Sequence, residues 1–159
     1  MDRRCQSLVG NVIDPLDIVD AYGADTLRTY VLFMGDYGAA APWSDASVRG
    51  CKRFLERFAG LTDIVTDEPN SESIETGVHK TIKKVSEDIE AMKYNTAIAA
   101  MMGLLNDIVA EGHITKENLI LLVKILCPFA PHLCEEMYEE LGGEGYCSLA
   151  QWPEFDPNK

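Results

Sequence analysis

The sequence of 159 residues has few of the features on which catalytic and metal-binding sites are built. It contains three histidines, and no two cysteines have the C-x-x-C spacing, so a zinc site is not supported. Neither a glycine-rich phosphate loop nor a G-x-G-x-x-G motif is present. No apolar run approaches the ~18 residues of a membrane-spanning helix, and the N-terminus lacks the apolar segment of a signal peptide. We therefore expect no metal, no cofactor and no membrane partner for this chain.

Disulfide bonds are also not expected. The five cysteines are an odd number and show no paired spacing, which is typical of free thiols in a reducing compartment. The sequence accordingly predicts a cytoplasmic protein.

Positive charge is scarce, with 14 Lys and Arg against 26 Asp and Glu, a net charge of −12. A general nucleic-acid-binding protein is usually basic, so the total argues against one. Half of the cations nevertheless lie in two short stretches, and any RNA-binding surface is expected there because each phosphate contact releases condensed counterions. The two groups are Arg49, Lys52, Arg53 and Arg57, and Lys80, Lys83 and Lys84.

The alternative for both groups is structural. Lys83 and Lys84 have Glu87 and Asp88 at helical i, i+4 spacing, so they can form an ordinary solvated helix face. The arginines can pair with carboxylates of other helices, since the guanidinium fork suits carboxylate as well as phosphate.

Apolar residues recur with the period of an α-helix over most of the chain, and no long strand-like alternation occurs. The sequence predicts an all-α protein, a bundle of about four or five helices with a short helical lead-in. Residues 12–22 are expected to form a turn and a short helix. The other expected helices span about residues 25–34, 44–65, 72–92, 95–112, 115–126 and 131–141.

Several polar residues are candidate helix caps. Asp14, Ser44, Thr115 and the pair Asn95-Thr96 each precede a helical pattern and are expected to cap its N-terminus. Gly112 is expected to end a helix.

The sequence also predicts the packing of three other residues. Trp43, just before a helix, is expected to pack as a hydrophobic staple rather than stack on a base. His132, at the start of the last helix, is expected to be a buried polar anchor. Leu27 lies on an apolar stripe of its helix together with Tyr30, Val31 and Met34.

Residues 10–28, from Gly10-Asn11-Val12-Ile13-Asp14 to Leu27-Arg28, resemble the stretch that follows the KMSKS loop in class I aminoacyl-tRNA synthetases. Further blocks, in matching order and spacing, are similar to leucyl-tRNA synthetases of the bacterial type, and the resemblance covers residues 10–159. These blocks are Leu32–Gly35, Trp43–Asp45, Arg53–Leu55, His79–Val85, Tyr94–Ala99, Pro128–His132 and Trp152–Pro153.

The resemblance implies a division of the chain. Residues 1–9 would be a degenerate remnant of the KMSKS loop, without its lysines, or residues added to the natural chain. The other parts would be stem-contact helices (10–43), an anticodon-binding-type helical bundle (44–150) and a C-terminal tail (151–159).

The resemblance also implies a function. We expect a tRNA-binding helical domain that positions leucine tRNA for ATP-dependent leucylation by a catalytic domain outside this sequence. This chain alone is expected to be non-catalytic and to hold no ATP, and self-association through the exposed stem-contact surface is expected. The alternative is a free-standing helical protein-interaction scaffold that has lost tRNA binding.

Overall fold

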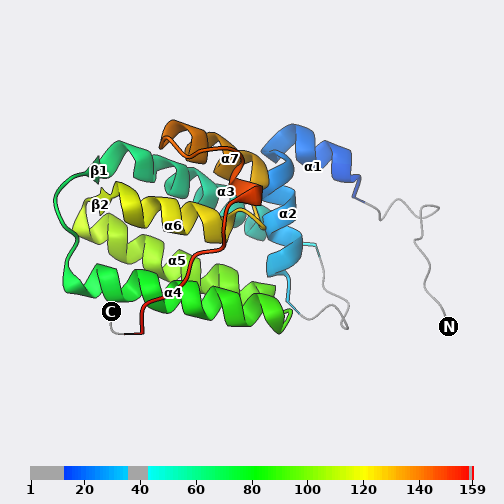
Figure 1. Cartoon of the computed structure of the whole chain (residues 1–159). Helices are drawn as coiled ribbons and strands as arrows, with labels where there is room; N and C mark the ends of the chain where they lie inside the picture. The colour runs from blue at the N-terminus through cyan, green and yellow to red at the C-terminus, as the bar shows by residue number, and fades with distance from the viewer. Residues whose placement is uncertain (1–12, 36–42, 158) are drawn as a thin grey trace.

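The computed structural model describes residues 13–35, 43–157 and 159. The predicted KMSKS remnant at 1–9 and the segment 36–42 lie outside the described residues. Within these ranges the fold is built from seven α-helices (Figure 1), which confirms the all-α prediction. They are α1 (Pro15–Tyr22), α2 (Ala24–Phe33), α3 (Asp45–Ala59), α4 (Glu72–Glu90), α5 (Tyr94–Glu111), α6 (Lys116–Leu126) and α7 (Pro131–Glu140).

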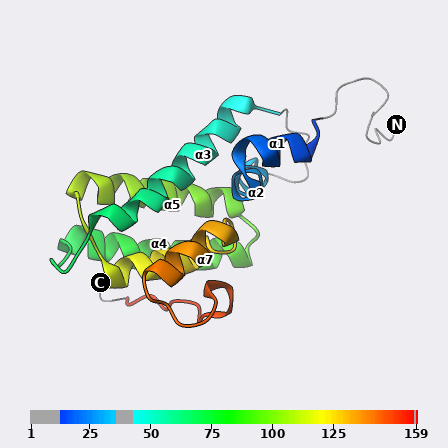
Figure 2. The same ribbon diagram turned by 90° about the horizontal axis from the view of Figure 1, so that it is seen from above.

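The long helices α3 to α6 form the bundle, with α4 and α5 side by side as an antiparallel pair (Figures 1 and 2). Helix α7 packs on α6, and α1 and α2 lie together at one end of the bundle. The C-terminal segment follows a short 3-10 turn, η3 (Cys147–Leu149), and runs back along α4. None of the described helices is both long enough and apolar enough to cross a membrane.

Three of the described α-helices begin directly after predicted N-cap residues. The side chains of Asp14, Ser44 and Thr115 each accept a hydrogen bond from a backbone N–H of the first turn that follows. The prediction for Asn95 was wrong, because α5 already begins at Tyr94 and its N-cap is Lys93. The Lys93 N–H bonds to the carbonyl of Asp88 at 2.7 Å, so the turn between α4 and α5 closes before Asn95 is reached.

The predicted helix 44–65 is too long. Helix α3 ends at Ala59, residues Gly60–Ile64 form a 3-10 helix (η2), and Val65–Thr66 form a short strand, β1. Strand β1 pairs in parallel with β2 (Ile114–Thr115), with Val65 opposite Ile114. Two-residue strands show no alternation, so sequence periodicity does not reveal them.

The core is one large apolar cluster to which the helices from α3 to α7 contribute. A smaller cluster lies where α1 and α2 pack on α3. The apolar stripe of α2 does not pack into it as a unit, since Val31 and Met34 are 43% and 40% exposed. Thr26 and Thr29 are buried instead. The hydroxyl of Thr29 lies 3.4 Å from the carbonyl oxygen of Phe129, while Tyr30 is buried and Leu27 packs against the smaller apolar cluster.

Candidate nucleic-acid interface

The three predicted lysines of α4 lie on one exposed face, but they differ in what they contact. The Nζ of Lys84 is 2.6 Å from Oδ1 of the buried Asp88, and the Nζ of Lys83 is 4.0 Å from Oε1 of Glu87. Lys83 also lies 5.6 Å from the ring centroid of Phe155. No hydrogen bond or ion pair joins Lys80 to another described residue, so its ammonium is available to a ligand.

The predicted cations of α3 form a second group. Lys52 lies 3.7 Å from Glu56, and Nη2 of Arg57 donates to Oδ1 of Asn106 at 2.9 Å. Arg49 and Arg53 make no such contact within the described ranges. Among the described residues, Arg49 and Arg53 are therefore not paired with carboxylates of other helices.

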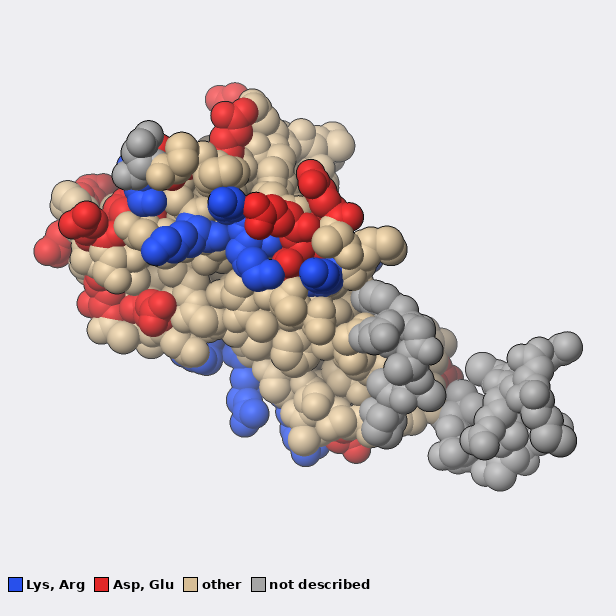
Figure 3. Space-filling model, turned by 90° about the horizontal axis from the view of Figure 1, so that it is seen from below, with Lys and Arg blue, Asp and Glu red and all other residues tan. Residues whose placement is uncertain are grey.

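The structure does not merge the two groups. Helix α5 contacts both α3 and α4, and so keeps the two basic faces apart. Figure 3 views the molecule from the side of α4 and shows basic side chains in one band with acidic side chains at both ends. A separate basic set lies along the lower edge of this view. The face of α4 is thus a limited positive surface on an acidic molecule.

The C-terminal segment adds groups to the α4 face that sequence reasoning missed. The Trp152 Nε1–H donates to Oγ of Ser86 at 2.8 Å, and the Asp156 N–H donates to Nδ1 of His79 at 3.0 Å. The Nζ of Lys159 lies 3.2 Å from Oε2 of Glu75. These contacts follow no periodic pattern in the sequence. Trp152-Pro153 was the only sequence feature that indicated packing of this segment on the bundle.

Two single residues behave differently from each other. Trp43 packs edge-on against Tyr30 with ring centroids 4.8 Å apart and donates from Nε1 to Asp45, which confirms packing rather than a free stacking surface. The expectation of a buried His132 was wrong, since its side chain is 78% exposed. Asp25 is the anchor at this point, because its carboxylate accepts the N–H of Leu133 at 2.7 Å at the start of α7.

Four carboxylates are held ionised by their hydrogen bonds. Burial raises the pKa of Asp88, but hydrogen bonds from Lys84 and Thr96 outweigh it and hold the pKa below its ordinary value. The pKa of Glu111 is lowered by hydrogen bonds from Ser71. Glu75 and Glu135 also have lowered pKa values.

No described cluster of three or more His, Cys, Asp or Glu residues has the arrangement of a metal site. The basic face of α4 is a surface suited to charge-based recognition of a polyanion.

Comparison with known proteins identifies the family of the chain. Residues 72–159 match the family model for the anticodon-binding domain of tRNA ligase. Leucine–tRNA ligase of Alkaliphilus oremlandii (strain OhILAs) is 48% identical over 151 residues, covering 94% of this chain and 19% of the relative. The enzyme of the same name from Bdellovibrio bacteriovorus is 48% identical over 153 residues, covering 92% and 19%.

Among solved structures, the ternary complex of Agrobacterium radiobacter K84 LeuRS-tRNA-LeuAMS contains a chain with a TM-score of 0.82 and 30% identity. The match covers 98% of this chain and 23% of that one. This chain spans about a fifth of the length of the curated relatives it matches. The resemblance to leucyl-tRNA synthetases is confirmed, and the chain belongs to the family of anticodon-binding domains of tRNA ligases.

Proposed function

We propose that this chain is the helical tRNA-binding part of a leucyl-tRNA synthetase and that it binds leucine tRNA. One observation carries the proposal. The relative whose printed title names a complex with tRNA has the same fold over 98% of this chain.

The basic faces of α4 and α3 are the proposed phosphate-binding surfaces. Lys80, Arg49 and Arg53 make no hydrogen bond or ion pair to another described residue, so phosphates can engage them without breaking an existing contact. The carboxylates around the α4 band and the net charge of −12 oppose binding of RNA elsewhere on the molecule. Such an arrangement favours a defined docking position over general affinity for RNA.

Positioning of the tRNA for leucylation belongs to the same proposal. The chemistry and its ATP would be supplied by a catalytic domain outside these 159 residues. Ile13 and Leu16 before and within α1, and Val31 and Met34 on and after α2, are between 40% and 68% exposed. Apolar side chains exposed in this way suit a protein contact, and we assign them to the catalytic domain.

The test is a titration of fluorescent leucine tRNA and of one unrelated tRNA with this chain, followed by anisotropy at about 50 and 200 mM salt. We expect tighter binding of leucine tRNA and a marked loss of affinity at the higher salt. The variant K80E/K83E should weaken binding at least about tenfold and lower the salt slope by about 1–2. Lys84 is kept in this variant because it supports the buried Asp88.

Two further variants complete the design. R49E/R53E makes the same change in charge on α3 and shows whether that face also contacts the tRNA. Lys116→Glu, at the exposed start of α6, is the control and should change affinity little. Absence of salt-sensitive binding to either tRNA at low salt would overturn the proposal. The scaffold alternative would then predict self-association, measured by sedimentation.

A further inference from the structure

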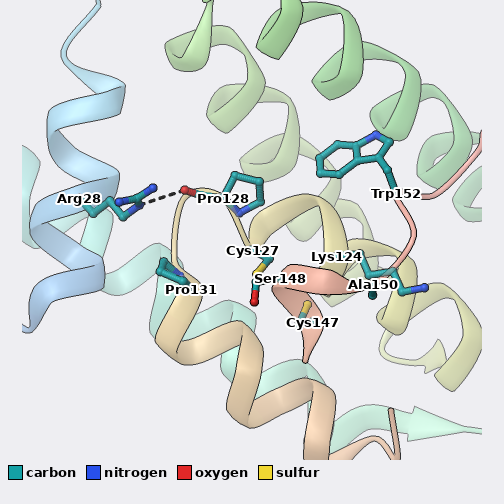
Figure 4. Close-up of a pocket in the computed structure, with 9 residues that line it drawn as sticks. All are labelled: Arg28, Lys124, Cys127, Pro128, Pro131, Cys147, Ser148, Ala150 and Trp152. Carbon is teal, nitrogen blue, oxygen red and sulfur yellow. Dashed lines mark hydrogen bonds between the residues drawn. The ribbon is translucent and has the colours of Figure 1, made fainter. Parts of the chain in front are cut away.

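A cavity of about 260 Å³ opens where α2, the turn between α6 and α7, and the C-terminal segment meet (Figure 4). Its walls include Arg28 from α2, Pro128 and Pro131 from the turn, and Trp152 from the C-terminal segment. None of the seven cations assigned to RNA binding lines it. Sites for drug-sized ligands measure about 300–1,000 Å³, so this open cavity of about 260 Å³ can enclose part of a ligand of that size.

The cavity has a positive lining in an acidic protein. Its lining contains Arg28 and Lys124 and no carboxylate, although the chain has 26 acidic residues. The ammonium of Lys124 lies 6.0 Å from the ring centroid of Tyr138, which does not line the cavity, so Arg28 is the main source of positive charge in the lining. An anionic group is therefore favoured over a cation or a neutral ligand.

The carboxylates beside the cavity are already engaged. Asp25 accepts the Leu133 N–H at the start of α7. Glu135 accepts the backbone N–H of Cys147 at 2.6 Å and that of Ser148 at 2.9 Å, at the start of η3. Both carboxylates are held by hydrogen bonds at helix N-termini and neither bonds the Arg28 guanidinium, although their charges reach the lining, where burial and these charges raise the pKa of Cys127.

Arg28 is oriented for a ligand. Its Nε donates to the carbonyl oxygen of Pro128 at 2.9 Å, and no other hydrogen bond joins its guanidinium to a described residue. The two Nη groups therefore remain available, and their fork geometry suits phosphate oxygens.

Trp152 supplies a fixed aromatic wall. Its N–H is held by Ser86 at 2.8 Å, and the residue is 38% exposed. Figure 4 shows the indole on one side of Pro128 and the Arg28 guanidinium on the other. Cys127 and Cys147 also line the cavity, and burial raises the pKa of both thiols, so this part of the lining is uncharged. A flat apolar group fits such a wall, as unpaired bases fit aromatic side chains.

We propose that this cavity binds one nucleotide, with its base against the Trp152 indole and its phosphate at the Arg28 guanidinium. An unpaired nucleotide of an RNA and a free nucleoside monophosphate offer the same chemistry. The RNA source rests on the proposed function, whereas the free nucleotide does not.

The first arm of the experiment uses the variant Trp43→Phe, which leaves Trp152 as the only tryptophan of the two in the chain. Titration with AMP, GMP, CMP and UMP should give saturable quenching of its fluorescence. Adding Ser148→Phe should fill the cavity and weaken this binding at least about fivefold. Ser148 is exposed, but both its backbone N–H and its side chain bond Glu135, so circular dichroism and urea unfolding are used to confirm that the variant keeps its fold.

Arg28→Gln tests the phosphate contact. It should weaken binding of AMP and leave binding of adenosine unchanged, because adenosine carries no phosphate. Equal losses for AMP and adenosine would remove Arg28 from the site.

The second arm compares an unpaired RNA oligonucleotide, the same sequence in a duplex, and leucine tRNA. Losses caused by Ser148→Phe for unpaired RNA and tRNA identify the RNA source. A loss for monophosphates alone identifies a free nucleotide. If Ser148→Phe changes the binding of neither RNA nor monophosphates, the proposal is overturned. K80E/K83E separates the two proposals, since it should weaken tRNA binding while leaving nucleotide quenching unchanged.

Discussion

The buried carboxylate of Asp88 accepts a hydrogen bond from the hydroxyl of Thr96 at 2.6 Å, and this contact joins the end of α4 to the start of α5. Its other oxygen lies 2.6 Å from the Nζ of Lys84. Asp88 is 4% exposed, so loss of its charge would remove the ionic partner of Lys84 and one of the two acceptor oxygens at the boundary of the core.

We expect Asp88→Asn to lower the free energy of unfolding by about 1–3 kcal/mol, since hydrogen bonds to charged groups contribute about that much. Urea unfolding at neutral pH measures the change. Glu87→Gln is the control. Because Glu87 is exposed and lies 4.0 Å from Lys83, this substitution should lower the free energy of unfolding by less than about 0.5 kcal/mol. Equal effects of the two substitutions would contradict this role of Asp88.

The stability of the fold should fall in acid. The pKa of Asp88 in the folded protein lies below its ordinary value, as do those of Glu75 and Glu111. The stabilisation from such a group is present above the unfolded-state pKa of about 4 and is lost as the pH falls through the lower folded-state pKa. Unfolding followed between about pH 5 and 2 should therefore show a smaller pH dependence in Asp88→Asn than in the parent chain. Parallel curves would contradict the prediction.

The side chain of Asn70 should also stabilise the fold. Its Nδ2 donates to Glu111 and to the carbonyl oxygen of His113, and its Oδ1 accepts the N–H of Thr115 at 2.9 Å. Asn70→Ala leaves these groups without partners and should lower the free energy of unfolding by about 1–3 kcal/mol. Asn106→Ala, on the exposed side of α5, should cost at most about 0.5 kcal/mol. Both are measured by urea unfolding.

Two glycine substitutions should act in opposite directions. Gly103 lies within α5 and a Cβ there meets open space, so Gly103→Ala should raise the free energy of unfolding by about 0.5–1 kcal/mol. A Cβ at Gly143 would collide with the ring of Tyr138, and Gly143→Ala should cost about 1–3 kcal/mol. Thermal unfolding of the two variants should show shifts of opposite sign.

The buried cysteines should react slowly. Burial raises the pKa of Cys51 to about 11 and, together with the neighbouring Cys127, that of Cys147 to about 12, so little thiolate forms at pH 8. The pKa of Cys134 is also raised well above its ordinary value by burial. Ellman's reagent at pH 8 should leave these thiols unreacted in the native protein and titrate all five cysteines after denaturation. Fast labelling of Cys147 in the native state would contradict this.

Much of the helical structure was predictable because it is local. The caps at Ser44 and Thr115 join groups three residues apart, and Gly112 ends α5 with a left-handed backbone. The error at Asn95 was local: the Lys93 N–H bonds to the Asp88 carbonyl in a C-terminal cap of α4, with Met92 in the left-handed conformation that glycine usually supplies. The strand pair β1–β2 was missed for a different reason, since its partners are 49 residues apart, from Val65 to Ile114.

The candidate site was predictable in composition but not in arrangement. Charge clustering located the lysines of α4 and the arginines of α3, but only packing places α5 between them. Helical i, i+4 spacing indicated that Lys84 can pair with Asp88, but it did not indicate that Asp88 is buried or that Lys80 remains available.

The sequence by itself determined the helices, their order and the family resemblance, because apolar period, caps and motif spacing act over a few residues. The tertiary structure alone decided which side chains meet across the fold. Arg28 bonds the carbonyl oxygen of Pro128 across 100 residues, and Trp152 bonds Ser86 across 66. Such contacts depend on how the helices pack, and packing is set by the whole core rather than by any local pattern.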